Sequence, residues 1–195
     1  MTTDIIIPQK ERWTYEDYLH LIPPDSFGFE ILRGELIVSP SPNRRHQQTV
    51  LSLGRLLDVH VNTQNLGEIF VAPFDVVLDA DSSVSENIVQ PDLMFISKNR
   101  LNIITDDNIR GAPDLVIEVL SDSTARYDRV GKMRTYTEFG VKEYWIIDAD
   151  QKTLEAFELT GDEPVLQATM AESDVFKPKL FPGLEISLSE LWYPE

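Results

Sequence analysis

Hydrophobic and polar residues follow two different periods along the chain. Within residues 44–61, apolar side chains recur every three or four positions, which predicts an amphipathic helix. The segments 68–79, 89–97 and 113–120 are instead rich in β-branched and aromatic residues and are separated by polar linkers, so we predict three strands. A second helical segment, 123–140, starts at a Ser-Thr pair and stops at a glycine, a residue that commonly ends a helix.

Shorter elements flank this central part. Thr14 is followed three residues later by Asp17, a capping pattern that predicts a short helix ending at two prolines. Residues 29–42 predict two short strands around a tight turn and a proline-rich loop. Residues 141–159 predict a strand and its hairpin partner, and the C-terminal segment is expected to pack through Leu188, Leu191 and Trp192.

The order of these elements indicates the fold class. A strand, a helix and another strand follow one another within 113–147, which implies at least one parallel strand pair, so we predict a mixed sheet of the α/β or α+β class. With 195 residues, 42% of them hydrophobic, the chain suits one domain spanning 1–195. We divide that domain into an N-terminal helix and hairpin (12–42), a core (44–160) and a C-terminal tail (161–195).

Composition excludes several classes of site. The chain has no cysteine, which rules out disulfides and thiolate chemistry, and its three histidines disfavour a histidine-rich zinc site. The N-terminal run of three isoleucines is far shorter than the about 20 apolar residues of a membrane span, so we expect a cytoplasmic protein without a membrane partner. A net charge of −16 also opposes general attraction to nucleic acid, although residues 97–134 hold seven Lys/Arg against six Asp/Glu.

Glu118 stands out because it interrupts the apolar strand predicted for 113–120. A buried ionised carboxylate costs several kcal/mol unless a cation, a metal or hydrogen bonds replace the lost solvent. Asp92 opens the preceding strand directly after a proline. If these strands are neighbours, the two carboxylates converge, and their repulsion requires a divalent cation or a basic residue between them. Oxygen ligands without cysteine favour Mg²⁺ or Mn²⁺.

Each of these residues also has a purely structural interpretation. Glu118 would pair with an arginine of the following helix, Arg126 or Arg129, and Asp92 alone would be a strand-edge carboxylate. Asp114, at the start of the same strand as Glu118, is the alternative partner if Asp92 proves distant.

Lys132 has two interpretations as well. It is either a solvated lysine in an i,i+4 pair with Asp128 or, if its face of the helix turns to the sheet, a cation that reaches the carboxylates. In the second case its ammonium would orient a water molecule or stabilise charge on a phosphate.

Four stretches of the chain together resemble the Uma-two family of bacterial proteins, within the PD-(D/E)xK restriction-endonuclease-like superfamily. They are PD at 91–92, PDLVIEVLSDSTARYD at 113–128, GKMRTYTEFGVKEYWIID at 131–148 and FEILRGELIVSPSP at 29–42. The resemblance extends from about Tyr15 to Leu191. It implies an αβββαβ core and a metal-dependent phosphodiesterase site.

The resemblance also assigns roles to individual residues. The first-motif aspartate falls on Asp92 and the second-motif glutamate on Glu118, whereas Leu120 stands where the superfamily has its lysine. The resemblance suggests that this lysine has moved to the next helix, as Lys132. Glu30 matches an acidic position of the family's ELxxGE segment and is implied as a further metal ligand.

Two nearby residues are less clear from the sequence. Glu35 is the less favoured choice for the ligand assigned to Glu30, and a charged hairpin edge explains it equally well. His46 begins a helix and either is structural or approaches the site or a phosphate.

Three hypotheses follow for the function. The first is a Mg²⁺- or Mn²⁺-dependent DNA endonuclease, which by analogy with restriction-type nucleases would act as a homodimer. The second is a nuclease-fold protein without cleavage activity that binds nucleic acid or protein, which the net charge and Leu120 favour. The third is an acidic assembly subunit in which Glu118 only pairs with an arginine.

Overall fold

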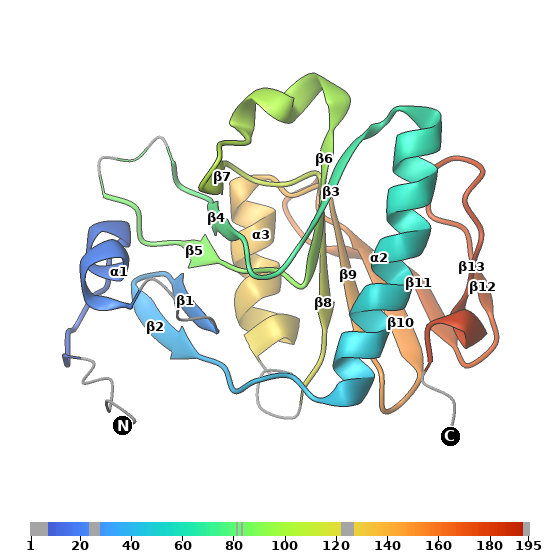
Figure 1. Cartoon of the computed structure of the whole chain (residues 1–195), viewed down its shortest axis with the longest axis horizontal. Helices are drawn as coiled ribbons and strands as arrows, with labels where there is room; N and C mark the ends of the chain where they lie inside the picture. Colours follow the sequence, from blue (N-terminus) through green and yellow to red (C-terminus); the bar gives the residue numbers. More distant parts are fainter. Residues whose placement is uncertain (1–7, 24–27, 81, 83, 122–126, 193–195) are drawn as a thin grey trace.

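Two β-sheets dominate the structure, a computed structural model that describes residues 8–23, 28–80, 82, 84–121 and 127–192 (Figure 1). The strands of the larger sheet are β3 (Gly67–Val71), β6 (Leu93–Ser97), β8 (Leu115–Val119), β9 (Glu143–Asp148), β10 (Thr153–Glu158) and β11 (Val165–Ala171). Their order across the sheet is β11-β10-β9-β8-β6-β3. The β8-β9 pair is parallel and its neighbours are antiparallel, so the predicted mixed sheet is confirmed.

The strands of the smaller sheet all come from residues 29–110. Its strands are β1 (Phe29–Leu32), β2 (Glu35–Val38), β4 (Asp75–Val77), β5 (Ile88–Val89) and β7 (Asn108–Arg110), in the order β2-β1-β5-β4-β7. The β1-β2 hairpin turns at Arg33 and Gly34, which both have positive φ angles of 56° and 79°. Two positive φ angles match the right-handed twist of a two-residue hairpin, so the predicted turn is confirmed.

The helices begin and end near the predicted residues. Helix α1 (Tyr15–Leu21) has the expected capping box between Thr14 and Asp17. Helix α2 (Arg44–Gln64) continues past the predicted end at 61 and stops at Asn65, which adopts the left-handed conformation. The end predicted from the turn-like composition of 62–67 is therefore too early, because the left-handed residue that ends the helix is Asn65.

The second predicted helix has an unusual beginning. A π-helical turn, η2 (Tyr127–Lys132), leads into α3 (Met133–Phe139), which ends at Gly140 with a φ of 83°. The predicted stop at the glycine is confirmed, whereas the predicted Ser-Thr start lies outside the described residues. A π-helical turn offsets the side chains from regular helical spacing, so sequence periodicity alone does not fix which way Lys132 points.

Two predicted strands are each divided between the two sheets. The segment 68–79 forms β3 and β4 on either side of Pro73, and 89–97 forms β5 and β6 on either side of Pro91. Proline cannot donate to a strand ladder, so the chain leaves one sheet and joins the other at these points. The prediction of single continuous strands was wrong here.

Further elements occur where the sequence predicted only linkers and a tail. The linker 98–111 contains the 3₁₀ turn η1 (Lys98–Ile103) and strand β7. The segment after residue 160 forms β11, the short pair β12 (Val175–Phe176) and β13 (Ile186–Ser187), and the turn η3 (Leu188–Glu190). Leu188 and Leu191 are fully buried, which confirms their predicted packing.

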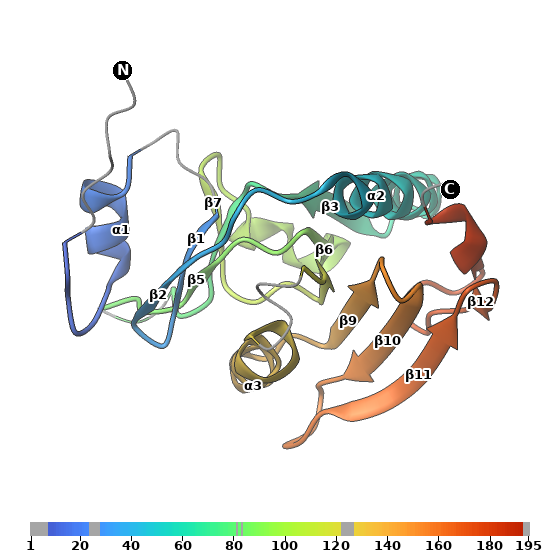
Figure 2. The ribbon, with the colours of Figure 1, turned by 90° about the horizontal axis from the view of Figure 1, so that it is seen from below.

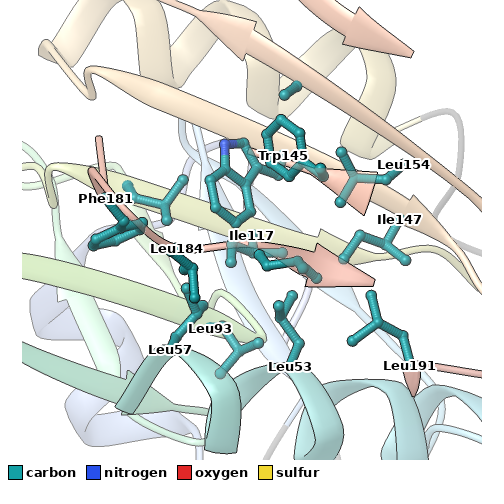
Figure 3. Packing of buried hydrophobic residues seen from close by; sticks show 14 of the residues in the cluster. Leu53, Leu57, Leu93, Ile117, Trp145, Ile147, Leu154, Phe181, Leu184 and Leu191 are labelled. Atoms are coloured by element: carbon teal, nitrogen blue, oxygen red, sulfur yellow. The ribbon is translucent and has the colours of Figure 1, made fainter. Parts of the chain in front are cut away.

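Helices α2 and α3 cover opposite faces of the larger sheet (Figure 2). On the α2 side, Leu53 and Leu57 pack with Ile117 and Trp145 in one hydrophobic cluster (Figure 3). On the α3 side, Val116 packs with Tyr136 and other residues in a second cluster. The order α2, β3, β6, β8, α3, β9 is the αβββαβ arrangement, so the expected core is present. None of the described helices combines the length and the hydrophobicity that a membrane span needs.

Candidate active site

Asp92 and Glu118 are side by side at one end of the larger sheet. Leu93 pairs with Ile117 across β6 and β8, so one position further along this antiparallel ladder Asp92 stands opposite Glu118. The Oδ2 atom of Asp92 accepts a hydrogen bond of 2.8 Å from the backbone N–H of Val119. Both carboxylates line one pocket of about 420 Å³, so the predicted convergence of these two residues is present.

Glu118 is only 4% exposed, and two side chains from the next helical segment compensate its burial. Lys132 Nζ and the Tyr136 hydroxyl each lie 2.9 Å from Glu118 Oε1. Lys132 is itself 5% exposed, which contradicts its interpretation as a solvated lysine. The ammonium therefore faces the sheet, as the alternative interpretation required.

Glu30 reaches the same pocket from β1 in the smaller sheet. Its Oε2 lies 2.9 Å from Lys132 Nζ, and its Oε1 accepts a 2.7 Å hydrogen bond from the backbone N–H of Gln90. Lys132 is thus held between Glu30 and Glu118, which come from different sheets. Glu35, on β2, is exposed and does not line the pocket, in keeping with a charged hairpin edge.

His46 also lies in this pocket, from the first turn of α2. Its Nε2 is 3.1 Å from Asp92 Oδ2, and the residue is 7% exposed. The sequence left open whether His46 approaches the site, and the structure places it in direct contact with Asp92. Helix α2 makes this contact possible because it begins beside the end of β6 where Asp92 lies.

The sequence also suggested that Glu118 pairs with Arg126 or Arg129, and that Asp114 takes the place of Asp92. Arg129 pairs with Glu155 rather than with Glu118. Arg126 lies outside the described residues, as does the side chain of Asp128. Asp114 is fully buried at the other end of β8, where it pairs with Arg100 and Lys142. It is therefore a structural carboxylate and not the partner of Glu118.

Tyr136 belongs to the candidate site, although it was not predicted from the sequence. Burial, followed by the negative charge of Glu118, raises the pKa of its hydroxyl well above the ordinary value, so it remains a protonated donor at neutral pH. Its position four residues after Lys132 was the available signal, because residues at this spacing share a helix face.

Gln90 and Asp75 form a second layer behind Glu30. The Gln90 side chain donates a 2.7 Å hydrogen bond to Asp75 Oδ1, while its backbone N–H binds Glu30. Burial is the largest cause that raises the pKa of the Asp75 carboxyl, and the nearby Glu30 adds to it. No sequence pattern pointed to these two residues, since only the meeting of β1, β4 and β5 brings them together.

Comparisons with known proteins identify the family and the fold of the chain. The model of the Uma2 family, described as "Putative restriction endonuclease", matches residues 15–189. The chain belongs to the Uma2 family. An uncharacterized Synechocystis protein, sll1609, is 29% identical over 161 residues, which cover 81% of this chain and 87% of the relative. The crystal structure of a "putative nuclease belonging to DUF820" from Anabaena variabilis has a TM-score of 0.73 at 19% identity, covering 92% of this chain and 97% of that one.

This Uma2 protein therefore has the restriction-endonuclease-like nuclease fold expected from its sequence. The carboxylate oxygens of Asp92 and Glu118 suit a hard cation such as Mg²⁺, which proteins commonly bind through one or two carboxylates together with water and substrate phosphates. Among the described residues, no three Asp, Glu or His side chains are grouped closely enough to hold a metal by themselves. Asp92 and Glu118 are the carboxylates that could contribute to a cation site, whereas both oxygens of Glu30 already contact Lys132 and Gln90.

Proposed function

We propose that this Uma2 protein is a DNA endonuclease that depends on Mg²⁺ or Mn²⁺. The observation that carries the proposal is the meeting of Asp92, Glu118 and Lys132 in one pocket, from three elements distant in sequence. The family description supports a nuclease of the restriction type. Two carboxylates can hold a divalent ion for metal-assisted hydrolysis of a phosphodiester, and a nearby ammonium can stabilise the negative charge that develops.

Asp92 and Glu118 would hold the cation. Once bound, a divalent ion lowers the pKa of water and neutralises charge on the phosphate. The chain's own residues then have defined tasks: the hydrogen bond from Val119 fixes Asp92, and the hydroxyl of Tyr136 fixes Glu118. The metal-ligand role expected of Glu30 stays a prediction, and its contacts favour a role in orienting Lys132.

Lys132 would act on the attacking water and on the phosphate. Glu30 and Glu118 hold the ammonium of Lys132 at the pocket wall, so this ammonium is fixed in place before substrate arrives. A preorganised cation stabilises the negative charge that develops as the phosphorus becomes pentacovalent. Helix-borne Lys132 thereby takes the place of a lysine at position 120, where the chain has leucine.

Cleavage of supercoiled plasmid DNA with Mn²⁺ or Mg²⁺ tests this proposal. We expect nicking or linearisation by the natural protein and losses of about 100-fold or more for Glu118→Gln and Lys132→Ala. Glu35→Gln is a matched control, because it removes an exposed carboxylate from the same hairpin as Glu30 and should leave activity unchanged. Equal activity in all four proteins would defeat the assignment.

The second candidate is a nuclease-fold module that does not cleave. The charge of −16 supports it, together with the full engagement of Lys132 by two carboxylates. Calorimetric titration with Mg²⁺ and with Mn²⁺ separates the two candidates. Absence of metal uptake, with or without binding of DNA, would favour the module over the enzyme.

We also propose that the protein works in the cytoplasm as a homodimer, since restriction-type enzymes commonly cut the two strands of a duplex with two copies of one site. Sedimentation-velocity measurements at several concentrations test the dimer. A monomer at all concentrations, with only nicking of plasmid, would indicate an enzyme that cuts one strand at a time.

A further inference from the structure

The contact between His46 and Asp92 joins the first turn of α2 to the residue directly before β6. His46 is the third residue of α2, and its backbone N–H donates a 3.0 Å hydrogen bond to Oδ1 of the capping residue Asn43. The cap fixes the first helical turn, and Leu53 and Leu57 anchor the same helix in the core. The helix therefore holds the imidazole of His46 in place beside the end of β6.

The two oxygens of Asp92 are treated differently. Oδ2 accepts a hydrogen bond from the Val119 N–H at 2.8 Å, and the His46 Nε2 lies 3.1 Å from the same oxygen. No hydrogen bond from the described residues reaches Oδ1, although the side chain lines the pocket and is 17% exposed. Two nitrogens from different elements against one oxygen limit the rotation of the carboxyl group, and they leave the other oxygen for a ligand in the pocket.

The second ring nitrogen of His46 shows what this contact costs. Nδ1 is buried and has no hydrogen-bond partner among the described residues. Burial of an unpaired polar atom is unfavourable, and an aliphatic side chain at this position would avoid it. The contact of Nε2 with the Asp92 carboxylate is the interaction that can compensate this cost.

We infer that His46 is a positioning residue that orients the Asp92 carboxylate for binding of a divalent cation. The inference rests on the proposed function, because it gives His46 a task only if Asp92 holds a metal. It adds a residue from α2 to a site otherwise built from the two sheets, η2 and α3. Groups that orient metal ligands in this way commonly change metal affinity by about 10- to 100-fold when removed.

Calorimetric titration with Mn²⁺ alone tests the inference on the full chain. We expect His46→Leu to weaken Mn²⁺ binding by about tenfold or more, and His46→Gln to retain most of the affinity because its terminal amide nitrogen can replace Nε2. His60→Leu is the matched control: His60 lies on the same helix, also has a buried ring nitrogen without a partner among the described residues, and does not line the pocket.

The outcomes distinguish this inference from the proposed function. Unchanged Mn²⁺ affinity in His46→Leu, with affinity lost in Glu118→Gln, would overturn the inference and leave the metal site standing. No Mn²⁺ binding by the natural protein would overturn both. If thermal unfolding shows that His46→Leu does not fold, His46→Gln and His46→Asn decide the matter, because the shorter asparagine cannot reach Asp92. Equal affinity in those two variants would also overturn the inference.

Discussion

Lys132 Nζ and Glu118 Oε1 lie 2.9 Å apart inside the protein, Glu118 on strand β8 and Lys132 on the helical connection that leads from β8 to the parallel strand β9. Glu30 shares the same ammonium from the other sheet. A buried lysine between two buried glutamates is a costly arrangement, since each ion loses its hydration. The protein maintains it at the wall of a pocket, where the proposed chemistry uses all three charges.

Replacement of Lys132 by methionine should strongly destabilise the fold. The change leaves Glu30 and Glu118 buried without their shared cation, so we expect the free energy of unfolding to fall by about 3–5 kcal/mol at pH 7. Adding Glu30→Gln to this variant should recover part of the loss, because one of the two carboxylates is then neutral. Urea unfolding measures both effects, with Arg129→Met as a control that breaks only the more exposed pair with Glu155. A loss no larger than in that control would contradict the prediction.

Tyr136→Phe removes one hydroxyl and leaves the ring in the core. Because that hydroxyl donates to the buried carboxylate of Glu118, we expect a loss of about 2 kcal/mol in the free energy of unfolding. Tyr15→Phe provides the comparison: its hydroxyl contacts only the neutral amide of Asn108 among the hydrogen bonds of the described residues, and its loss should be smaller. Equal losses in the two variants would show that the charge of Glu118 adds nothing to the interaction.

Asp114→Asn should lower stability in a pH-dependent way. Burial raises the pKa of Asp114, but hydrogen bonds from Lys142 and Ser97 outweigh it and leave the pKa below the usual 3.8. The unfolded chain therefore binds the proton more readily, so this stabilisation is present above pH 3.8 and disappears as the pH falls through the folded-state pKa.

We accordingly expect Asp114→Asn to cost about 2 kcal/mol at pH 7 and progressively less in acid. Urea unfolding at pH 7 and at pH values below the usual aspartate pKa tests this. Asp150→Asn is the control, because it affects only an exposed pair with Arg45. A difference from the natural protein that does not change with pH would contradict the electrostatic explanation.

Asp75→Asn should raise the stability of the protein, the opposite of the effect expected for Asp114→Asn. Burial raises the pKa of Asp75, so the folded protein binds the proton more readily than the unfolded chain, and stability falls as the pH rises through this raised value. An asparagine oxygen can still accept from Gln90 and Tyr18, which both donate to Oδ1. We therefore expect a higher melting temperature than the natural protein at pH 7, with the difference vanishing toward pH 3.8. A lower melting temperature at pH 7 would show that Asp75 contributes more as an anion than its burial costs.

Local pattern was sufficient for most of the secondary structure. The cap at Thr14, the turn at Arg33-Gly34 and the stop at Gly140 depend on residues close in sequence, and each lies where the sequence predicted it. The division of 68–79 between two sheets was not predictable in this way. Apolar composition marks a buried strand but does not say which sheet it joins.

The sequence by itself also singled out Glu118 and Asp92, because a carboxylate in or directly beside an apolar strand requires compensation wherever it folds. Only the tertiary structure decided what supplies that compensation. A π-helical turn points Lys132 at Glu118, β1 delivers Glu30 to the same ammonium, and α2 carries His46 to Asp92. These contacts join separate elements across two sheets, and packing of the whole chain fixes such distances, whereas short-range periodicity fixes only the elements themselves.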